Sequence, residues 1–333
     1  MIAKEYTVTF EDGVFKELFQ KFIAYKQGLG FKYGREAQSC LRRLNAELNV
    51  LKLVNPVLTK ATVESLASKH GHEAPATQLK RICYLRHFAA FLKEMAYEAY
   101  VYPDYCNVVH HESFAPYIFS ERQIQSIVLV ADSMPFSLAS PKHHLVWPAF
   151  FRVLYGCGLR LSEALNLKAK DVSLDSGILY IEKSKNNTSR YVPMSASLIS
   201  YLSKYAADVG LDLLGDGYFF PAPDNGRYAI NTARGHIKKL YEKAGIPRLG
   251  NGRHPRVHDV RHTYSCHALK KMQDSGYDLY YSLPILSAYL GHQGIRDTER
   301  YLRLPIFQFL AVVDAENAVL NGIIPEVPDH EEA

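Results

Sequence analysis

The chain has 333 residues, which is more than one typical hydrophobic core needs and suits two domains of ordinary size. Apolar residues make up 47% of the chain, and this share excludes an extensively disordered protein. The net charge of +5 and the isoelectric point near 8.7 permit contact with nucleic acid but do not require it. The five cysteines are scattered without C-x-x-C spacing, so we expect neither a disulfide framework nor a zinc site.

No part of the sequence predicts a membrane segment. The N-terminal residues MIAKEYTVTFEDG lack the long apolar run of a signal peptide. The longest apolar stretches elsewhere are too short and too interrupted to span a bilayer. We therefore expect a soluble, cytoplasmic protein.

Residues 1–108 predict a small helical domain. Apolar residues recur there at helical spacing, which predicts helices over 14–29, 35–51, 59–69 and 77–97. Residues 102–116 then break the pattern with prolines, polar residues and two histidines, which predicts a linker. The alternative is a long loop inside a single domain.

Residues 118–323 predict a second domain that mixes helices with a small antiparallel sheet. β-rich runs around 172, 177–181 and 190–192 are separated by polar turns and predict the strands. Helices are expected over 120–130, 144–155, 195–207, 231–244, 257–272, 283–290, 297–301 and 307–320. Residues 324–333 read as an acidic tail. The expected fold class is mainly α with a small antiparallel β-sheet.

The strongest functional signal is a set of basic residues followed by one tyrosine. They lie in three segments of the second domain: LYGCGLRLSEALNL, HDVRHTYSCHAL and LSAYLGHQGIRDTERYL. The residues of interest are Arg160, His258, Arg261, His262, His292 and Tyr301. Tyr301 is one of 23 tyrosines, and only its distance from His292 singles it out.

In this order and spacing the segments resemble the tyrosine recombinase (phage integrase) family, in which GLR-x-S-E, H-x-x-R, L-G-H and a tyrosine follow one another. The resemblance covers the whole second domain, and residues 1–108 are similar to the family's core-binding domain in position and length. It implies a site-specific recombinase that cuts and rejoins DNA through a 3′-phosphotyrosine intermediate. It also implies a bacterial, phage or mobile-element protein that acts on the nucleoid and forms a tetramer on paired double-stranded DNA sites.

The chemistry explains why such residues belong together. Attack on a phosphodiester builds negative charge on its oxygens, and Arg160 and Arg261 carry planar donor forks that stay charged. The resemblance assigns these arginines to the two non-bridging oxygens, His292 to a further phosphate contact and His258 to proton exchange with Tyr301. A phenol titrates near pH 10, so Tyr301 needs such assistance. Religation requires no ATP, metal or other cofactor, because the phosphotyrosine linkage retains the bond energy.

The resemblance also implies a lysine on the turn of the β-hairpin as the acid for the leaving 5′-oxygen. Lys183 and Lys185 are both candidates, and the pattern SKNNTSRYVP favours Lys185. A solvated surface charge is the alternative for either lysine.

Structural roles are the alternative for the other residues. Arg160 can cap a helix or pair with Glu163, and Glu163 is expected to support Arg160 by orienting it. His258 and His262 can be satisfied core histidines. That interpretation is favoured for His262, whereas Arg261 lies one turn from His258 and favours a functional role there. A helix-terminus role is the alternative for His292.

Further basic residues are candidates for phosphate contacts, which position an enzyme on DNA without reading its sequence. These are Arg35, Arg42, Arg43, Lys80, Arg81, Arg86, Lys183 and Arg190, and a solvated polar face is the alternative for each. Residues 307–320 are too apolar to remain exposed. They pack on their own domain or, as the resemblance implies, on a neighbouring protomer.

Two rival functions remain at this level. A type IB topoisomerase uses similar chemistry to relax supercoils, and a protein of the same fold can bind DNA without cutting it. The spacing from L-G-H to Tyr301 and the two-domain length favour the recombinase. The presence of every expected catalytic residue argues against the silent binding protein. No residue pattern names the target DNA sequence.

Overall fold

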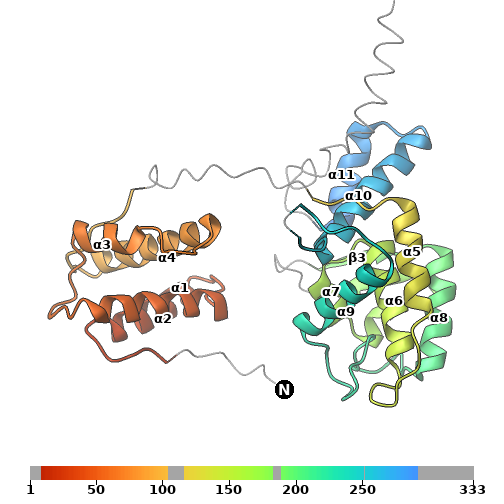
Figure 1. Cartoon of the computed structure of the whole chain (residues 1–333), viewed down its shortest axis with the longest axis horizontal. Helices are drawn as coiled ribbons and strands as arrows, with labels where there is room; N and C mark the ends of the chain where they lie inside the picture. The colour runs from red at the N-terminus through yellow and green to blue at the C-terminus, as the bar shows by residue number, and fades with distance from the viewer. Residues whose placement is uncertain (1–8, 104–115, 183–188, 251, 292–333) are drawn as a thin grey trace, which may run out of the picture. The chain divides into compact units, whose positions relative to one another are not determined.

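The computed structural model describes residues 9–103, 116–182, 189–250 and 252–291. These residues are mainly helical and include one small antiparallel sheet, which confirms the predicted fold class (Figure 1). The chain divides into two compact units between Phe114 and Ala115. None of the helices in the described ranges is both long and apolar enough to cross a membrane.

Residues 9–103 of the first unit form a bundle of four helices, which begin and end close to the predicted positions. They are α1 (Lys16–Gly28), α2 (Arg35–Val50), α3 (Lys60–Ala67) and α4 (Pro75–Glu94). Helix α4 begins two residues before the predicted start, because Pro75 suits the first turn of a helix, where no N–H is needed. Aromatic side chains fill the core, and the rings of Phe19 and Phe88 stack with centroids 3.9 Å apart.

Arg81 corrects one prediction about this unit. Its side chain is buried, its Nη2 and Nε donate to the Glu73 carboxylate at 2.6 and 3.1 Å, and Nη2 also donates to the Ser68 carbonyl at 2.8 Å. A buried guanidinium needs such partners, and these contacts remove Arg81 from the candidate DNA contacts. Lys80 instead pairs with Glu36 at the surface, and Nε of Arg86 donates to the Tyr102 carbonyl at 2.7 Å.

The described residues of the second unit form eight helical segments and a three-stranded sheet. The helices are α5 (Glu121–Asp132), α6 (His143–Gly156), α7 (Leu161–Asn166), the 3-10 helix η2 (Ala169–Asp171), α8 (Ala196–Val209), α9 (Ile230–Lys243), α10 (Val257–Asp274) and α11 (Leu279–Leu290). The strands are β1 (Val172–Ser173), β2 (Ile178–Ile181) and β3 (Arg190–Pro193), in the antiparallel order β1-β2-β3. Leu179 pairs with Val192 in the register, and both side chains point into the core.

Helix α6 is the centre of this unit. It buries Trp147, Phe150 and Phe151 completely and packs against α5, α8 and α10. Helix α10 is different, because the face it buries carries Asp259 and Arg261. Buried charges need partners, so this polar face marks the part of the core where a functional site is expected.

Helix α11 begins four residues before its predicted start. The Asp278 side chain accepts a hydrogen bond from the backbone N–H of Tyr280 at 2.6 Å and caps the first turn. The helix ends at Gly291, which adopts the left-handed conformation with φ +67°. The predicted helices over 297–301 and 307–320 lie outside the described residues.

Candidate active site

A tight turn before α7 places Arg160. Gly158 has φ +57°, and a Cβ at this position would lie 2.4 Å from Cδ1 of Tyr264, so the turn requires glycine. Arg160 then takes the cap position of α7, where its backbone N–H donates to Oε2 of Glu163 at 2.9 Å. The short helix therefore holds Arg160 through Glu163, which bonds both its backbone N–H and its side chain.

The Glu163 carboxylate is surrounded by three guanidinium groups. Oε1 accepts from Nη1 of Arg160 at 2.6 Å and from Nη1 of Arg190 at 3.1 Å. Oε2 accepts from Nη2 of Arg190 at 2.9 Å and lies 3.7 Å from Nη1 of Arg261. Burial raises the pKa of Glu163, but the hydrogen bonds and charge of Arg190 and the bonds from Arg160 outweigh it and lower the pKa to about 2. The carboxylate is therefore ionised at any ordinary pH.

The same three arginines reach the C-terminal end of α11. Nε of Arg190 donates to the Tyr289 carbonyl at 2.9 Å, and Nη2 of Arg261 donates to the Leu290 carbonyl at 2.6 Å. Nη2 of Arg160 lies at 3.4 Å from the Gly291 carbonyl. The last carbonyls of a helix lack partners within it and carry partial negative charge, so three cations stabilise this end. The next residue in the chain is His292.

Arg261 is the most deeply placed of these residues. Its side chain is 1% exposed, and its Nη1 donates to the Gly158 carbonyl at 2.8 Å. One guanidinium thus ties the turn before Arg160 to the end of α11. The resemblance assigns Arg261 to a phosphate oxygen, and in this structure its Nη1 and Nη2 are bonded to backbone carbonyls.

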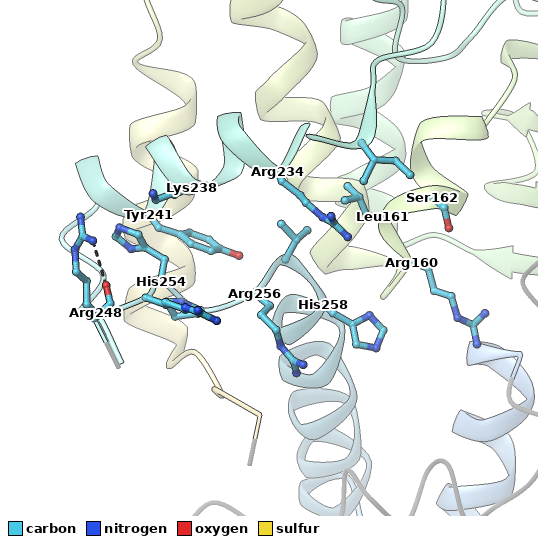
Figure 2. Close-up of a pocket in the computed structure, with 15 residues that line it drawn as sticks. Arg160, Leu161, Ser162, Arg234, Lys238, Tyr241, Arg248, His254, Arg256 and His258 are labelled. Atoms are coloured by element: carbon cyan, nitrogen blue, oxygen red, sulfur yellow. Dashed lines mark hydrogen bonds between the residues drawn. The ribbon is translucent and has the colours of Figure 1, made fainter. Parts of the chain in front are cut away.

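A basic pocket of about 830 Å³ opens beside this cluster (Figure 2). It is lined by Arg160, Leu161, Ser162, Ile230, Arg234, Lys238, Tyr241, Arg248, Gly252, Arg253, His254, Pro255, Arg256, Val257 and His258. None of these fifteen lining residues is a carboxylate, although Glu242 pairs with Arg248 and Asp259 pairs with Arg256. The wall of the pocket is therefore suited to a polyanion.

His258 stands in the first turn of α10 and faces this pocket (Figure 2). Partial enclosure of the ring, and then the neighbouring His262 and Arg261, lower the pKa of His258 to about 4. The ring of His262 meets the ring of His258 edge to face, with centroids 4.9 Å apart. His258 is consequently neutral near pH 7 and able to accept a proton.

The structure brings together Arg160, Glu163 and Arg261, and it places Arg160 and His258 on one pocket. The other expected catalytic residues, Lys183 or Lys185, His292 and Tyr301, lie outside the described residues. The candidate DNA contacts Arg35, Arg42 and Arg43 are exposed on the first unit.

Arg190 corrects a second prediction. The sequence suggests a DNA contact on the hairpin, but the side chain is 10% exposed and bonded to Glu163 and Tyr289.

The sequence alone did not identify Arg234, Lys238, Arg248 or Arg256 as pocket residues. Two features of the sequence do indicate these residues. Arg234 and Lys238 are four residues apart on α9 and therefore share one face. The run RLGNGRHPRVH just before α10 is dense in positive charge. Only the packing of α9 against α10 shows that both segments line one pocket.

Comparison with known proteins identifies the family. Residues 118–305 match the model of the phage integrase family. The putative integrase/recombinase y4rB of Sinorhizobium fredii is 29% identical over 292 residues, which are 86% of this chain and 92% of that protein. The tyrosine recombinase XerC of Xanthomonas axonopodis pv. citri is 32% identical over 165 residues, which are 50% of this chain and 48% of that protein.

Solved structures show the same fold. A XerH site-specific recombinase bound to a palindromic difH substrate aligns with a TM-score of 0.61 and 17% identity, over 83% of this chain and 77% of that one. A lambda integrase dimer bound to a COC′ core site aligns with a TM-score of 0.59 and 14% identity, over 86% of this chain and 94% of that one.

The fold and the sequence motifs together define a tyrosine-type site-specific recombinase, as predicted. Since the family model matches more than half of the chain, the protein belongs to the phage integrase family. Neither the topoisomerase nor the silent binding protein is favoured by these relatives.

Proposed function

We propose that this recombinase cuts double-stranded DNA by attack of the Tyr301 oxygen on a phosphodiester. The 3′-phosphate becomes bonded to Tyr301, and the bond to the 5′-oxygen breaks. His258 takes the phenol proton, and Lys185 protonates the departing 5′-oxygen. Rejoining runs the same steps in reverse with the 5′-hydroxyl of a partner strand.

The observation that carries this proposal is the charge at the cluster around Glu163. Three guanidiniums lie within 3.7 Å of one carboxylate, so positive charge exceeds negative charge by two. A scissile phosphate gains charge during attack, and Arg160, Arg261 and His292 would stabilise it. Preorganised donors of this kind contribute about 3 to 4 kcal/mol each in comparable sites.

The neutral form of His258 near pH 7 is the form that its role as the base requires. His258 is unprotonated at neutral pH because its pKa is lowered to about 4, and since this also makes it a weak base, proton transfer from Tyr301 has to accompany attack on the phosphate. Glu163 and His262 then act as supporting residues, because Glu163 bonds Arg160 and His262 contacts the His258 ring.

The basic pocket supports contact with the DNA backbone next to the cut. Arg234, Lys238 and Arg256 line it from α9 and the start of α10, and lysine or arginine contacts to phosphates give binding that weakens with salt. We further propose that residues 1–108 clamp the DNA, with Arg35, Arg42 and Arg43 among the contacts. Several protomers would assemble on paired sites as a tetramer, joined through residues 307–320.

Covalent capture tests the proposal directly. Fragments of the source genome are mixed with wild-type protein or with Tyr301→Phe, the protein is denatured, and the attached DNA is sequenced. We expect wild type alone to retain one short recurring sequence. Retention by Tyr301→Phe would refute the assignment of the nucleophile. Retention of many unrelated sequences by wild type would favour a topoisomerase.

A further inference from the structure

Arg190 lies on a hairpin strand, yet its side chain is nearly buried and makes several hydrogen bonds within the protein. It is the first residue of β3, and its side chain is 10% exposed. Nη1 and Nη2 form a two-pronged bond with both oxygens of Glu163, at 3.1 and 2.9 Å. Nε donates to the Tyr289 carbonyl at 2.9 Å. Each of the three guanidinium nitrogens therefore has a partner in the protein.

These contacts join three elements that are distant in the sequence. Arg190 lies 27 residues from Glu163 and 99 residues from Tyr289. It thus links β3 to α7, which carries Arg160, and to the last turn of α11. The link is also steric, since a Cβ on Gly291 would lie 3.0 Å from Cδ of Arg190. The left-handed turn at Gly291 therefore packs directly on the Arg190 side chain.

We infer that Arg190 is a positioning residue for strand cleavage, an inference that rests on the proposed function of Arg160. Arg190 bonds both oxygens of the Glu163 carboxylate, and the same two oxygens accept from the side chain and the backbone N–H of Arg160. It also bonds the Tyr289 carbonyl near the end of α11. A change at Arg190 therefore displaces Glu163 and, through it, Arg160, although the three guanidinium nitrogens of Arg190 are all bonded within the protein.

The geometry explains why arginine is needed. The guanidinium is a planar fork that bonds both carboxylate oxygens and still directs Nε to a carbonyl. A lysine ammonium is a compact charge without this fork, so it does not reproduce the two-pronged bond to Glu163 together with the bond to the Tyr289 carbonyl. Displacement of reacting groups by about 1 Å costs on the order of 100-fold in rate.

The test measures single-turnover formation of the covalent adduct at saturating DNA, on the site captured by wild type. We expect Arg190→Ala to slow cleavage about 100-fold and Arg190→Lys to restore part of the rate, with DNA affinity changed by less than about twofold. The matched control is Arg152→Ala, because Arg152 makes a similar two-pronged bond with Asp132 at 2.7 Å, away from the site. This control should cleave at the wild-type rate.

A double-mutant cycle separates positioning from general destabilisation. Arg190→Ala is combined with Arg160→Lys. As the control, Arg152→Ala is combined with Arg160→Lys. If Arg190 acts through Arg160, its substitution slows the Arg160→Lys protein far less than it slows wild type. An equal slowing in both backgrounds, or an Arg190→Ala protein that cleaves like wild type, would overturn the inference. Absence of any wild-type adduct would instead refute the proposed function.

Discussion

The charge of Glu163 offers a stability test of the cluster that does not depend on DNA. Glu163→Gln preserves the size of the side chain and removes its charge. Arg160 and Arg190 then lose their ionic partner in a nearly buried position, since the Glu163 side chain is 4% exposed. Breaking one half of a buried ion pair is strongly destabilising, because the remaining charge stays buried.

The magnitude follows from the pKa. The pKa of Glu163 is about 2 in the folded protein, against 4.5 for an unperturbed side chain, because Arg190 and Arg160 outweigh the effect of burial. At about 1.4 kcal/mol per pKa unit, the ionised group contributes about 3 kcal/mol to stability at pH 7. The folded-state pKa is the lower one, so this contribution is complete well above pH 4.5 and is lost as the pH falls towards 2.

Urea denaturation measures this contribution through Trp147. It is the only tryptophan of the chain and is buried in the second unit, so its fluorescence reports the unfolding of that unit. We expect Glu163→Gln to be less stable by about 3 kcal/mol at pH 7, with the difference reduced by about 1 kcal/mol at pH 3.5. Asp132→Asn serves as the control, because its pair with Arg152 is more exposed and should contribute less than about 1 kcal/mol.

The interpretation of the cluster is refuted by either of two results. One is a loss below about 1 kcal/mol for Glu163→Gln at pH 7, which is the size expected of an exposed pair. The other is a difference between wild type and Glu163→Gln that stays the same from pH 7 to pH 3.5.

Three other results are expected. Gly158→Ala should destabilise the second unit by about 1 to 3 kcal/mol in the same assay, because the added Cβ meets Tyr264 and φ is positive. A wild-type stability would contradict the turn geometry. The adduct-forming rate should show no inflection near pH 6.5 and should fall only as the pH approaches about 4, where His258 becomes protonated. Replacing both Arg234 and Lys238 by alanine should weaken DNA binding and reduce its salt dependence by about two phosphate contacts. The control is Lys204→Ala on α8, which should change neither. An unchanged salt dependence would exclude the pocket as a DNA contact.

Much of the architecture could be predicted from the sequence, because it depends on local patterns. The apolar spacing in α2 and α4, the β-rich runs at Leu179 and Val192 and the polar break after residue 102 each reflect neighbours in the chain. The motif residues could be found for a similar reason. Arg160, His258 and Arg261 have chemistry that is useful at a phosphate, and their order and spacing are visible without any coordinates.

The roles of individual arginines depended on tertiary structure. Arg42 and Arg81 both occur on helices of the first unit, yet Arg42 is exposed while Arg81 is buried against Glu73. Arg190 was expected at the DNA and instead bonds Glu163 and Tyr289.

The sequence by itself determined the family, the fold class and the chemical identity of the expected catalytic residues, since these follow from residue type and spacing. Only the tertiary structure decided which cations gather around Glu163 and which line the pocket. The reason is physical: Arg261 meets the Gly158 carbonyl across 103 residues of chain, and no local pattern encodes a contact over that separation. Whether a guanidinium bonds groups inside the protein or an anionic substrate depends on the partners that folding brings to it.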